Sequence, residues 1–217
     1  MTSIKKIIDL NQTTYHDQPS YPGLPRIRIN RLFTLPLDIA NVSELHLHTH
    51  AGTHIDAPYH FEENGETLDN IPLDRLVGEA VVINLPKKPN EGITLEDLKK
   101  YEKQIKKDDI VIINTGWYKK RGFNKEWLKQ WPYLTKEAAE WLRQKKIKAI
   151  GIDVCAIDQY GTQDFPAHHI LLSANIPIIE ELANLDEIKT ERTFIVALPL
   201  KIVGSDAAPA RVIAITF

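Results

Sequence analysis

The segment 46–61, which reads HLHTHAGTHIDAPYHF, constrains this chain more than any other part of the sequence. It holds five of the eight histidines, with an aspartate between the last two. Imidazole nitrogens and carboxylates are the ligands that zinc and its first-row neighbours prefer. His50, His54 and Asp56 would supply three ligands and leave positions open for water or a substrate. That layout is typical of a catalytic metal site rather than a closed structural one.

The backbone must turn inside this segment for the ligands to meet. At about 3.3 Å per residue, a continuous strand would hold His50 and His54 roughly 13 Å apart, beyond the reach of one ion. Gly52 accepts backbone angles that other residues avoid. We therefore expect a strand up to about His50, a tight bend at Gly52, and an irregular segment that gathers the polar side chains. A histidine-rich edge strand with a solvated face is the alternative, but the spacing and the additional His60 favour metal binding.

Composition limits the classes of function. A chain of 217 residues suits one domain, 1–217, and a net charge of −2 gives no support for nucleic-acid binding. The single cysteine, Cys155, excludes an internal disulfide framework and fits a reducing compartment. The short apolar run near the N-terminus predicts neither a signal peptide nor a membrane span. We therefore expect a cytoplasmic protein that binds neither nucleic acid nor membrane.

Hydrophobic patterns predict alternating strands and helices. The predicted strands are 6–10, about 27–33, 79–85, 109–114, 148–154, 193–198 and 211–217. The predicted helices are 95–105 after a Thr94 cap, 135–148 after a Thr135 cap, and 170–174, and 204–209 is read as a loop. The alternation indicates an α/β domain. Because the N-terminal strands do not form clean βαβ units, we do not expect an all-parallel sheet.

A second polar focus lies in the C-terminal half of the chain. His168 precedes an apolar helix and Glu180 follows an apolar run. Each is a weak candidate by itself, but the first cluster offers only three ligands, so a distant imidazole and carboxylate would complete it. Asp153 and Asp158, near the end of a predicted strand, could orient imidazoles or serve equally well as cap and turn residues.

Two aromatic residues are candidates for a substrate pocket. Tyr21 lies in a loop between two predicted strands, where it could project into a pocket or remain exposed. Trp117 follows a buried strand, at the kind of strand end where pockets form, although a packed core tryptophan is equally consistent with its position. We expect Cys155, at the end of another buried strand, to pack as a small apolar side chain rather than act as a nucleophile.

Residues 50–61 resemble the H-x-G-T-H-x-D-x-P-x-H-F signature of the cyclase family of metal-dependent hydrolases, which includes bacterial kynurenine formamidases and isatin hydrolases. Residues 151–158, 168–172, 179–185 and 198–211 resemble later blocks of the same family, so the resemblance spans nearly the whole chain. It implies a swivelling β/β/α domain with a mixed sheet and a barrel-like β core. It also implies a homodimer or homotetramer and one or two Zn²⁺ or Mn²⁺ ions per subunit.

The resemblance also implies roles for individual residues. By position, His50, His54 and Asp56 resemble ligands of a first ion. His168 and Glu180 resemble ligands of a second ion, with Asp56 and Glu180 shared between the two. The chain departs from the family pattern near its N-terminus. It has Tyr-Pro-Gly-Leu at 21–24, where kynurenine formamidases tend to have Trp-Pro-Gly-Asp.

The expected activity is hydrolysis of an amide C–N bond by metal-bound hydroxide, with N-formylkynurenine giving kynurenine and formate as the model reaction. A divalent ion lowers the pKa of its water from about 15.7 towards 7. His60, by resemblance the general acid/base, would pass a proton to the leaving nitrogen, and a third imidazole ligand is the alternative role. The alternatives are hydrolysis of a cyclic amide, as in isatin hydrolases, hydrolysis of another small amide or ester, and non-catalytic metal binding.

Overall fold

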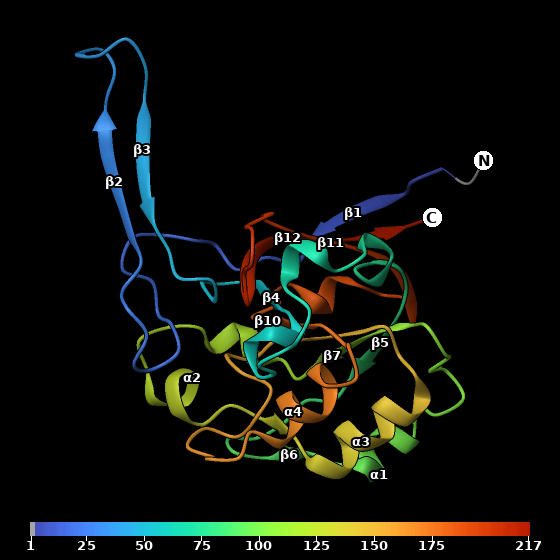
Figure 1. The fold of residues 1–217 in the computed structure, drawn as a ribbon. Coiled ribbons are helices and arrows are strands. Elements are labelled where there is room, and N and C mark those ends of the chain that lie inside the picture. The colour runs from blue at the N-terminus through green and yellow to red at the C-terminus, as the bar shows by residue number, and fades with distance from the viewer. Residues whose placement is uncertain (1–2) are drawn as a thin grey trace.

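The computed structural model describes residues 3–217, and eight strands of this part of the chain form one mixed sheet (Figure 1). They are β1 (Lys6–Asp9), β4 (His54–Asp56), β5 (Val77–Asn84), β7 (Ile110–Asn114), β9 (Ala149–Ile152), β10 (Ile178–Glu180), β11 (Arg192–Pro199) and β12 (Ala207–Thr216). The order is β1-β12-β11-β5-β7-β9-β10-β4, and β4 also pairs with β12. That last pairing closes all of these strands except β1 into a barrel. The expected α/β class with a mixed sheet and barrel-like core is confirmed.

The sheet is parallel in its middle and antiparallel elsewhere. Strands β5, β7, β9 and β10 run parallel to one another, whereas β11, β12, β1 and β4 join by antiparallel pairs. The helices α1 (Leu95–Lys99), α2 (Lys125–Lys129), α3 (Lys136–Lys145) and α4 (Pro166–Leu172) gather below the barrel in Figure 1. Short 3-10 turns lie at η1 (Pro58–His60), η2 (Leu68–Asn70), η3 (Leu73–Arg75), η4 (Trp117–Lys120) and η5 (Leu185–Glu187). A small parallel pair joins β6 (Gly92–Ile93) to β8 (Tyr133–Leu134).

Two apolar clusters occupy opposite faces of the sheet. Ile55, Ile112 and Ile179 belong to the cluster that fills the barrel. Ile113 and Ile178 belong to the second cluster, which packs between the sheet and the helices. Because successive side chains of a strand point to opposite faces, the residues next to Ile55 and Ile179 face away from the barrel interior.

Strand boundaries near the histidine segment differ from those expected. The strand expected to reach about His50 is β3 (Val42–His46), and it ends four residues earlier. The segment expected to be irregular contains β4, because its backbone groups pair with β10 on one side and β12 on the other. For the same reason β12 begins at Ala207, inside the expected loop 204–209.

Helix boundaries also differ, although both predicted threonine caps are confirmed. Thr94 forms a capping box with Asp97, and the Thr135 side chain accepts a hydrogen bond from the backbone of Ala138. The helix expected over 95–105 ends at Lys99, after which single turns replace it. The helix expected at 170–174 is α4, which begins earlier because a proline occupies its first position.

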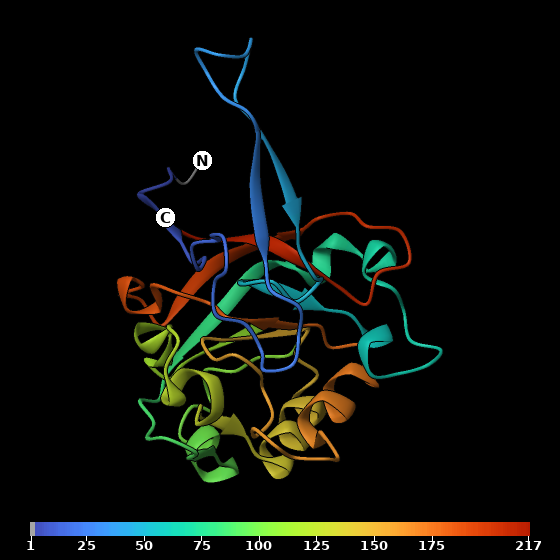
Figure 2. The same ribbon diagram turned by 90° about the vertical axis from the view of Figure 1, so that its left-hand side faces the viewer.

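A two-stranded ribbon projects from the body of the molecule (Figures 1 and 2). It consists of β2 (Arg28–Phe33) and β3, an antiparallel pair that continues into the turn 34–41. Its exposed large apolar side chains are Leu32, Phe33, Leu35, Leu37, Ile39, Val42 and Leu45. We call residues 28–46 the arm. Within residues 3–217, no helix has the length and apolarity needed to cross a bilayer.

Candidate metal centre

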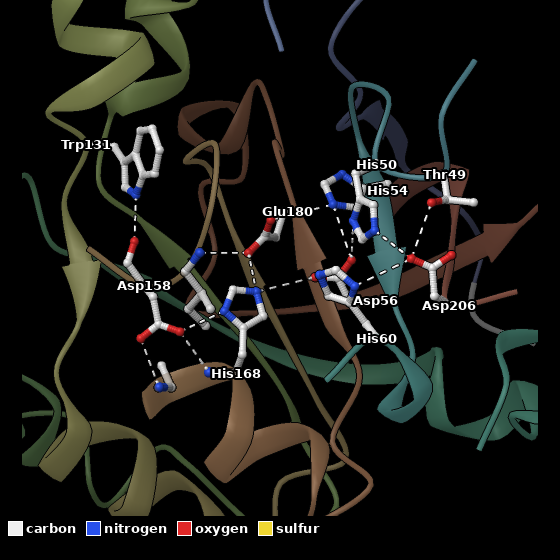
Figure 3. Close-up of polar contacts among 12 residues, drawn as sticks. Thr49, His50, His54, Asp56, His60, Trp131, Asp158, His168, Glu180 and Asp206 are labelled. Carbon is white, nitrogen blue, oxygen red and sulfur yellow. Dashed lines mark hydrogen bonds and ion pairs between the residues drawn. The ribbon is translucent and has the colours of Figure 1, made fainter. Parts of the chain in front are cut away.

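The pairing of β4 with β10 brings the first ligands together. In the antiparallel register, His54 lies opposite Glu180, and Asp56 lies two residues further along β4. Ile55 and Ile179 point into the barrel, so His54, Asp56 and Glu180 share the outer face. The His54 Nε2 atom is 3.3 Å from Asp56 Oδ1 and 3.5 Å from Glu180 Oε2. Two segments far apart in the sequence therefore meet at one buried polar cluster (Figure 3).

The bend expected at Gly52 is confirmed, and it places His50 beside Asp56. Gly52 has a φ of +66°, in the left-handed region that glycine adopts without strain. The bend leaves His50 Nδ1 2.9 Å from Asp56 Oδ1. The Gly52 carbonyl oxygen also accepts a hydrogen bond of 2.7 Å from His54 Nδ1, which leaves His54 Nε2 turned towards the carboxylates.

His168 reaches the same cluster from α4, and Asp158 orients it. Its Nδ1 donates to Asp158 Oδ2 at 2.7 Å, and the Asp158 carboxylate also accepts from the backbone N–H groups of Ala167 and His168. The free Nε2 atom of His168 lies 3.5 Å from Glu180 Oε1 and 3.8 Å from Asp56 Oδ2. Asp158 therefore combines the two roles that the sequence left open: it orients an imidazole and caps a helix.

Asp153 has only a turn role. Its Oδ1 accepts hydrogen bonds from the backbone N–H and the hydroxyl of Thr115, at 2.9 and 2.7 Å. Its Oδ2 accepts one from the backbone of Tyr118 at 3.4 Å. These bonds shape the chain as it leaves β7, and none of them involves an imidazole.

Asp206 is a member of this site that the sequence analysis did not identify. Its Oδ2 accepts a hydrogen bond of 2.9 Å from His50 Nε2 and lies 3.4 Å from His60 Nδ1 (Figure 3). Asp206 thus holds His50 as Asp158 holds His168, by fixing the ring nitrogen that faces away from the cluster. The only sequence signal for it was its place inside the block 198–211 that resembles the family.

The residues present fit a divalent cation. His54 Nε2 and both carboxylate oxygens of Asp56 are buried and form no hydrogen bond of good geometry, although imidazole nitrogens of His50, His54 and His168 lie 2.9, 3.3 and 3.8 Å from the carboxylate. A bound ion would satisfy these atoms, whose burial otherwise costs free energy. Among the described residues, two sets of potential ligand atoms each lie within 4.8 Å of one another. The first set is His50, Asp56 and His60, and the second is His54, Asp56 and Glu180. Nitrogen and carboxylate donors of this kind suit Zn²⁺ or Mn²⁺.

The electrostatics of the cluster favour positive charge. Burial alone would lower the pKa of His50, but the carboxylates of Asp56 and Asp206 outweigh burial and raise that pKa to about 10. Burial also favours neutral His54 and His168, but the neighbouring carboxylates outweigh it. They raise the pKa of His54 and place the pKa of His168 well above its ordinary value. Burial opposes ionisation of Asp56, yet the neighbouring imidazoles hold its pKa well below the usual range. The buried carboxylates therefore favour positive charge at these imidazoles, as they would favour a bound cation.

A cavity of about 220 Å³ opens onto this cluster. Its remaining walls are Tyr21, Leu24, Phe61, Cys155, Ala156, Phe165 and Glu181. Tyr21 therefore projects into a pocket, which is one of the two positions that its sequence left open, and its ring lies 5.7 Å from that of Trp131. Trp117 does not line the cavity. It is 1% exposed and packs in the cluster between the sheet and the helices, which is the alternative that the sequence left open.

Comparisons with known proteins agree with this geometry. Residues 8–159 match the family model described as "Putative cyclase". The chain is 32% identical over 212 residues to a kynurenine formamidase of Erythrobacter litoralis, covering 97% of this chain and 94% of that protein. It also resembles isatin hydrolase A from Labrenzia aggregata bound to benzyl benzoate, with 28% identity, a TM-score of 0.86, and coverage of 97% and 93%. A predicted metal-dependent hydrolase from Bacillus stearothermophilus is 33% identical, with a TM-score of 0.81 and coverage of 97% and 98%.

The family match covers most of the chain and includes His50, His54, Asp56 and His60 of the buried cluster. This chain therefore belongs to the cyclase family of metal-dependent hydrolases.

Proposed function

We propose that this protein hydrolyses the amide C–N bond of a small aromatic formamide, as in the conversion of N-formylkynurenine to kynurenine and formate. The relatives named as kynurenine formamidases support this reaction class. The observation that carries the proposal is a buried imidazole–carboxylate cluster that opens directly into a cavity with aromatic walls. Metal-dependent release of formate from N-formyl aromatic amines is the test. No hydrolysis across formamides, cyclic amides and esters would favour non-catalytic metal binding.

We infer that the ligands divide between two neighbouring positions that share Asp56 and Glu180. His50, His54 and Asp56 would hold one Zn²⁺ or Mn²⁺ ion, and His168 and Glu180 would contribute to a second. A bound cation would lower the pKa of a water molecule and polarise the substrate carbonyl. The chain keeps these ligands ready by burial and by the acceptors that fix the non-ligating nitrogens of His50, His54 and His168.

His60 is the proposed general acid and base. It lies in η1 at the edge of the cavity, with its side chain 26% exposed. The Asp206 carboxylate, 3.4 Å from His60 Nδ1, favours a proton on that nitrogen and leaves Nε2 to exchange a proton with the substrate. His60 Nε2 would then donate to the leaving nitrogen as the C–N bond breaks.

A second candidate reaction is the opening of a cyclic aromatic amide. The isatin hydrolase relative supports it, and so does the composition of the cavity. Among the described residues that line the cavity, the charged group outside the ligand cluster is Glu181, which is ion-paired with Arg121. Leu24 contributes an apolar wall. A substrate with a charged amino-acid group would find little there to replace its hydration, so we propose a preference for neutral aromatic substrates.

The arm supports assembly into a homodimer or homotetramer. At its turn, Leu37 and Ile39 are 92% and 102% exposed, and an isolated two-stranded ribbon is marginally stable in water. We propose that a second copy of the chain covers these side chains. The single buried cysteine, Cys155, is consistent with a reducing compartment, and we propose a cytoplasmic location.

Replacing His60 with alanine should lower kcat for a formanilide substrate by about 10²–10⁴-fold, the range of a lost general acid/base. Zinc content, measured by elemental analysis, should stay near that of the wild type. His169→Ala is the matched control, because His169 is an exposed histidine paired with Glu62 outside the cluster. Loss of zinc together with activity in His60→Ala would reassign His60 as a ligand.

Zinc binding near neutral pH should release protons. Ligating imidazoles must be neutral, whereas the pKa of His50 in the metal-free chain is raised to about 10. A proton therefore competes with the metal below that pKa, and apparent zinc affinity should rise as pH rises towards it. Calorimetry in two buffers of different ionisation enthalpy measures the released protons. Equal binding enthalpies in both buffers would contradict the proposed charge state.

Leu24→Asp should shift selectivity towards N-formylkynurenine. A carboxylate at this half-exposed position could pair with the substrate ammonium group, an interaction worth about 1 kcal/mol or roughly fivefold. The measured quantity is the ratio of kcat/KM for N-formylkynurenine to that for formanilide. Leu24→Asn is the matched control, since it has similar shape and polarity without the charge. An equal shift in both variants would show that charge at the cavity wall does not set selectivity.

The double substitution Leu37→Asp with Ile39→Asp should convert the assembly to a smaller species in sedimentation experiments. Charged groups in the middle of an apolar interface lose hydration without gaining partners. Leu73→Asp is the control, because Leu73 is 61% exposed but lies on the body of the molecule. An unchanged sedimentation coefficient in the arm variant would show that the arm is not an assembly surface.

A further inference from the structure

The residue that follows the ligand Glu180 has an unusual backbone conformation. Glu181 has a φ of +52°, in the left-handed region that a side chain with a Cβ rarely adopts. Among the described residues, five of the eight non-glycine residues with positive φ are asparagine or aspartate, which tolerate this region better. Glu181 is also only 1% exposed. Strain of this kind persists where the surroundings impose it, and it gathers at functional sites.

A buried ion pair holds Glu181 in place. The Arg121 Nε atom donates to Glu181 Oε2 at 3.1 Å, and the two side chains are 7% and 2% exposed. Arg121 Nη1 donates in turn to the Thr13 carbonyl at 3.1 Å. Both charged groups are too buried for water to solvate either one if its partner were removed. Each charge therefore depends on the other.

The backbone of Glu181 is fixed at both of its polar groups. Its N–H donates to the Val154 carbonyl at 3.0 Å. Its carbonyl accepts from the Thr53 hydroxyl at 2.7 Å, and that hydroxyl oxygen also accepts from the Gln12 N–H at 2.8 Å. Thr53 directly precedes the ligand His54. The turn at Glu181 is therefore tied to the segments that carry ligands on both β4 and β10.

We propose that the Arg121–Glu181 ion pair is a positioning device for the metal centre. It holds residue 181 in the left-handed conformation that ends β10 and thereby aims the Glu180 carboxylate at His54 and His168. The proposal rests on the metal centre of the proposed function and is independent of the substrate. Glu181 lines the same cavity as the cluster, but among the described residues no hydrogen bond or ion pair joins the Arg121 or Glu181 side chain to a proposed ligand, so both act through Glu180.

The test measures zinc affinity of the full chain by competition with a chelator. Arg121→Met keeps the length of the side chain and removes its charge. It should weaken zinc binding by about 10–100-fold, the usual effect of losing a partner that orients a ligand. Adding Glu181→Gly should restore affinity to near that of the wild type, because glycine adopts positive φ without an ion pair. Glu181→Gly alone would leave the buried Arg121 charge without its partner, so the double variant, which lacks that charge, is the one that isolates the backbone effect.

The control is Arg192→Met, which removes another ion pair, with Asp109, away from the metal centre. It should leave zinc affinity unchanged. Unchanged affinity in Arg121→Met, or affinity that stays low in the double variant, would overturn the proposal. If Arg121→Met fails to fold, the double variant decides by itself, since it lacks both the unpaired charge and the strain. The zinc affinities test this proposal without any measurement of activity. A protein that binds zinc as expected but hydrolyses nothing would count against the proposed function and not against this proposal.

Discussion

The candidate metal centre depends on the hydrogen bonds that join β4 to β10 on one side and to β12 on the other. This short strand closes the barrel, and the same pairing places His54 opposite Glu180. Because Ile55 and Ile179 bury their side chains in the barrel, the neighbouring polar residues must face outwards. The packing that stabilises the fold therefore also fixes which side chains meet at the site.

The ligand cluster was predictable from the sequence because its chemistry is local and its spacing is unusual. His50, His54 and Asp56 lie within one segment, and the need for a bend between them followed from the length of an extended chain. His168 and Glu180 could be assigned only through the resemblance to a family, since neither has a distinctive local pattern. The α/β class followed from the alternation of elements, and the lack of clean βαβ units argued against an all-parallel sheet, but barrel closure required strand pairing that no local pattern specifies.

What the sequence could not provide were contacts between distant segments. Asp206 acts through His50 and His60, which are far from it in the chain. The segment expected to be irregular became a strand because two partners pair with it, and the Trp117 side chain turned into the core rather than the cavity. In each case contacts between distant segments, rather than local propensity, decided the outcome.

We propose that Asp56 and Glu180 converge on a divalent cation. Anomalous X-ray diffraction from crystals grown with zinc tests it most directly. We expect an anomalous peak between β4 and β10, with the carboxylates of Asp56 and Glu180 within coordination distance. Peaks confined to surface histidines, with none at this cluster, would contradict it.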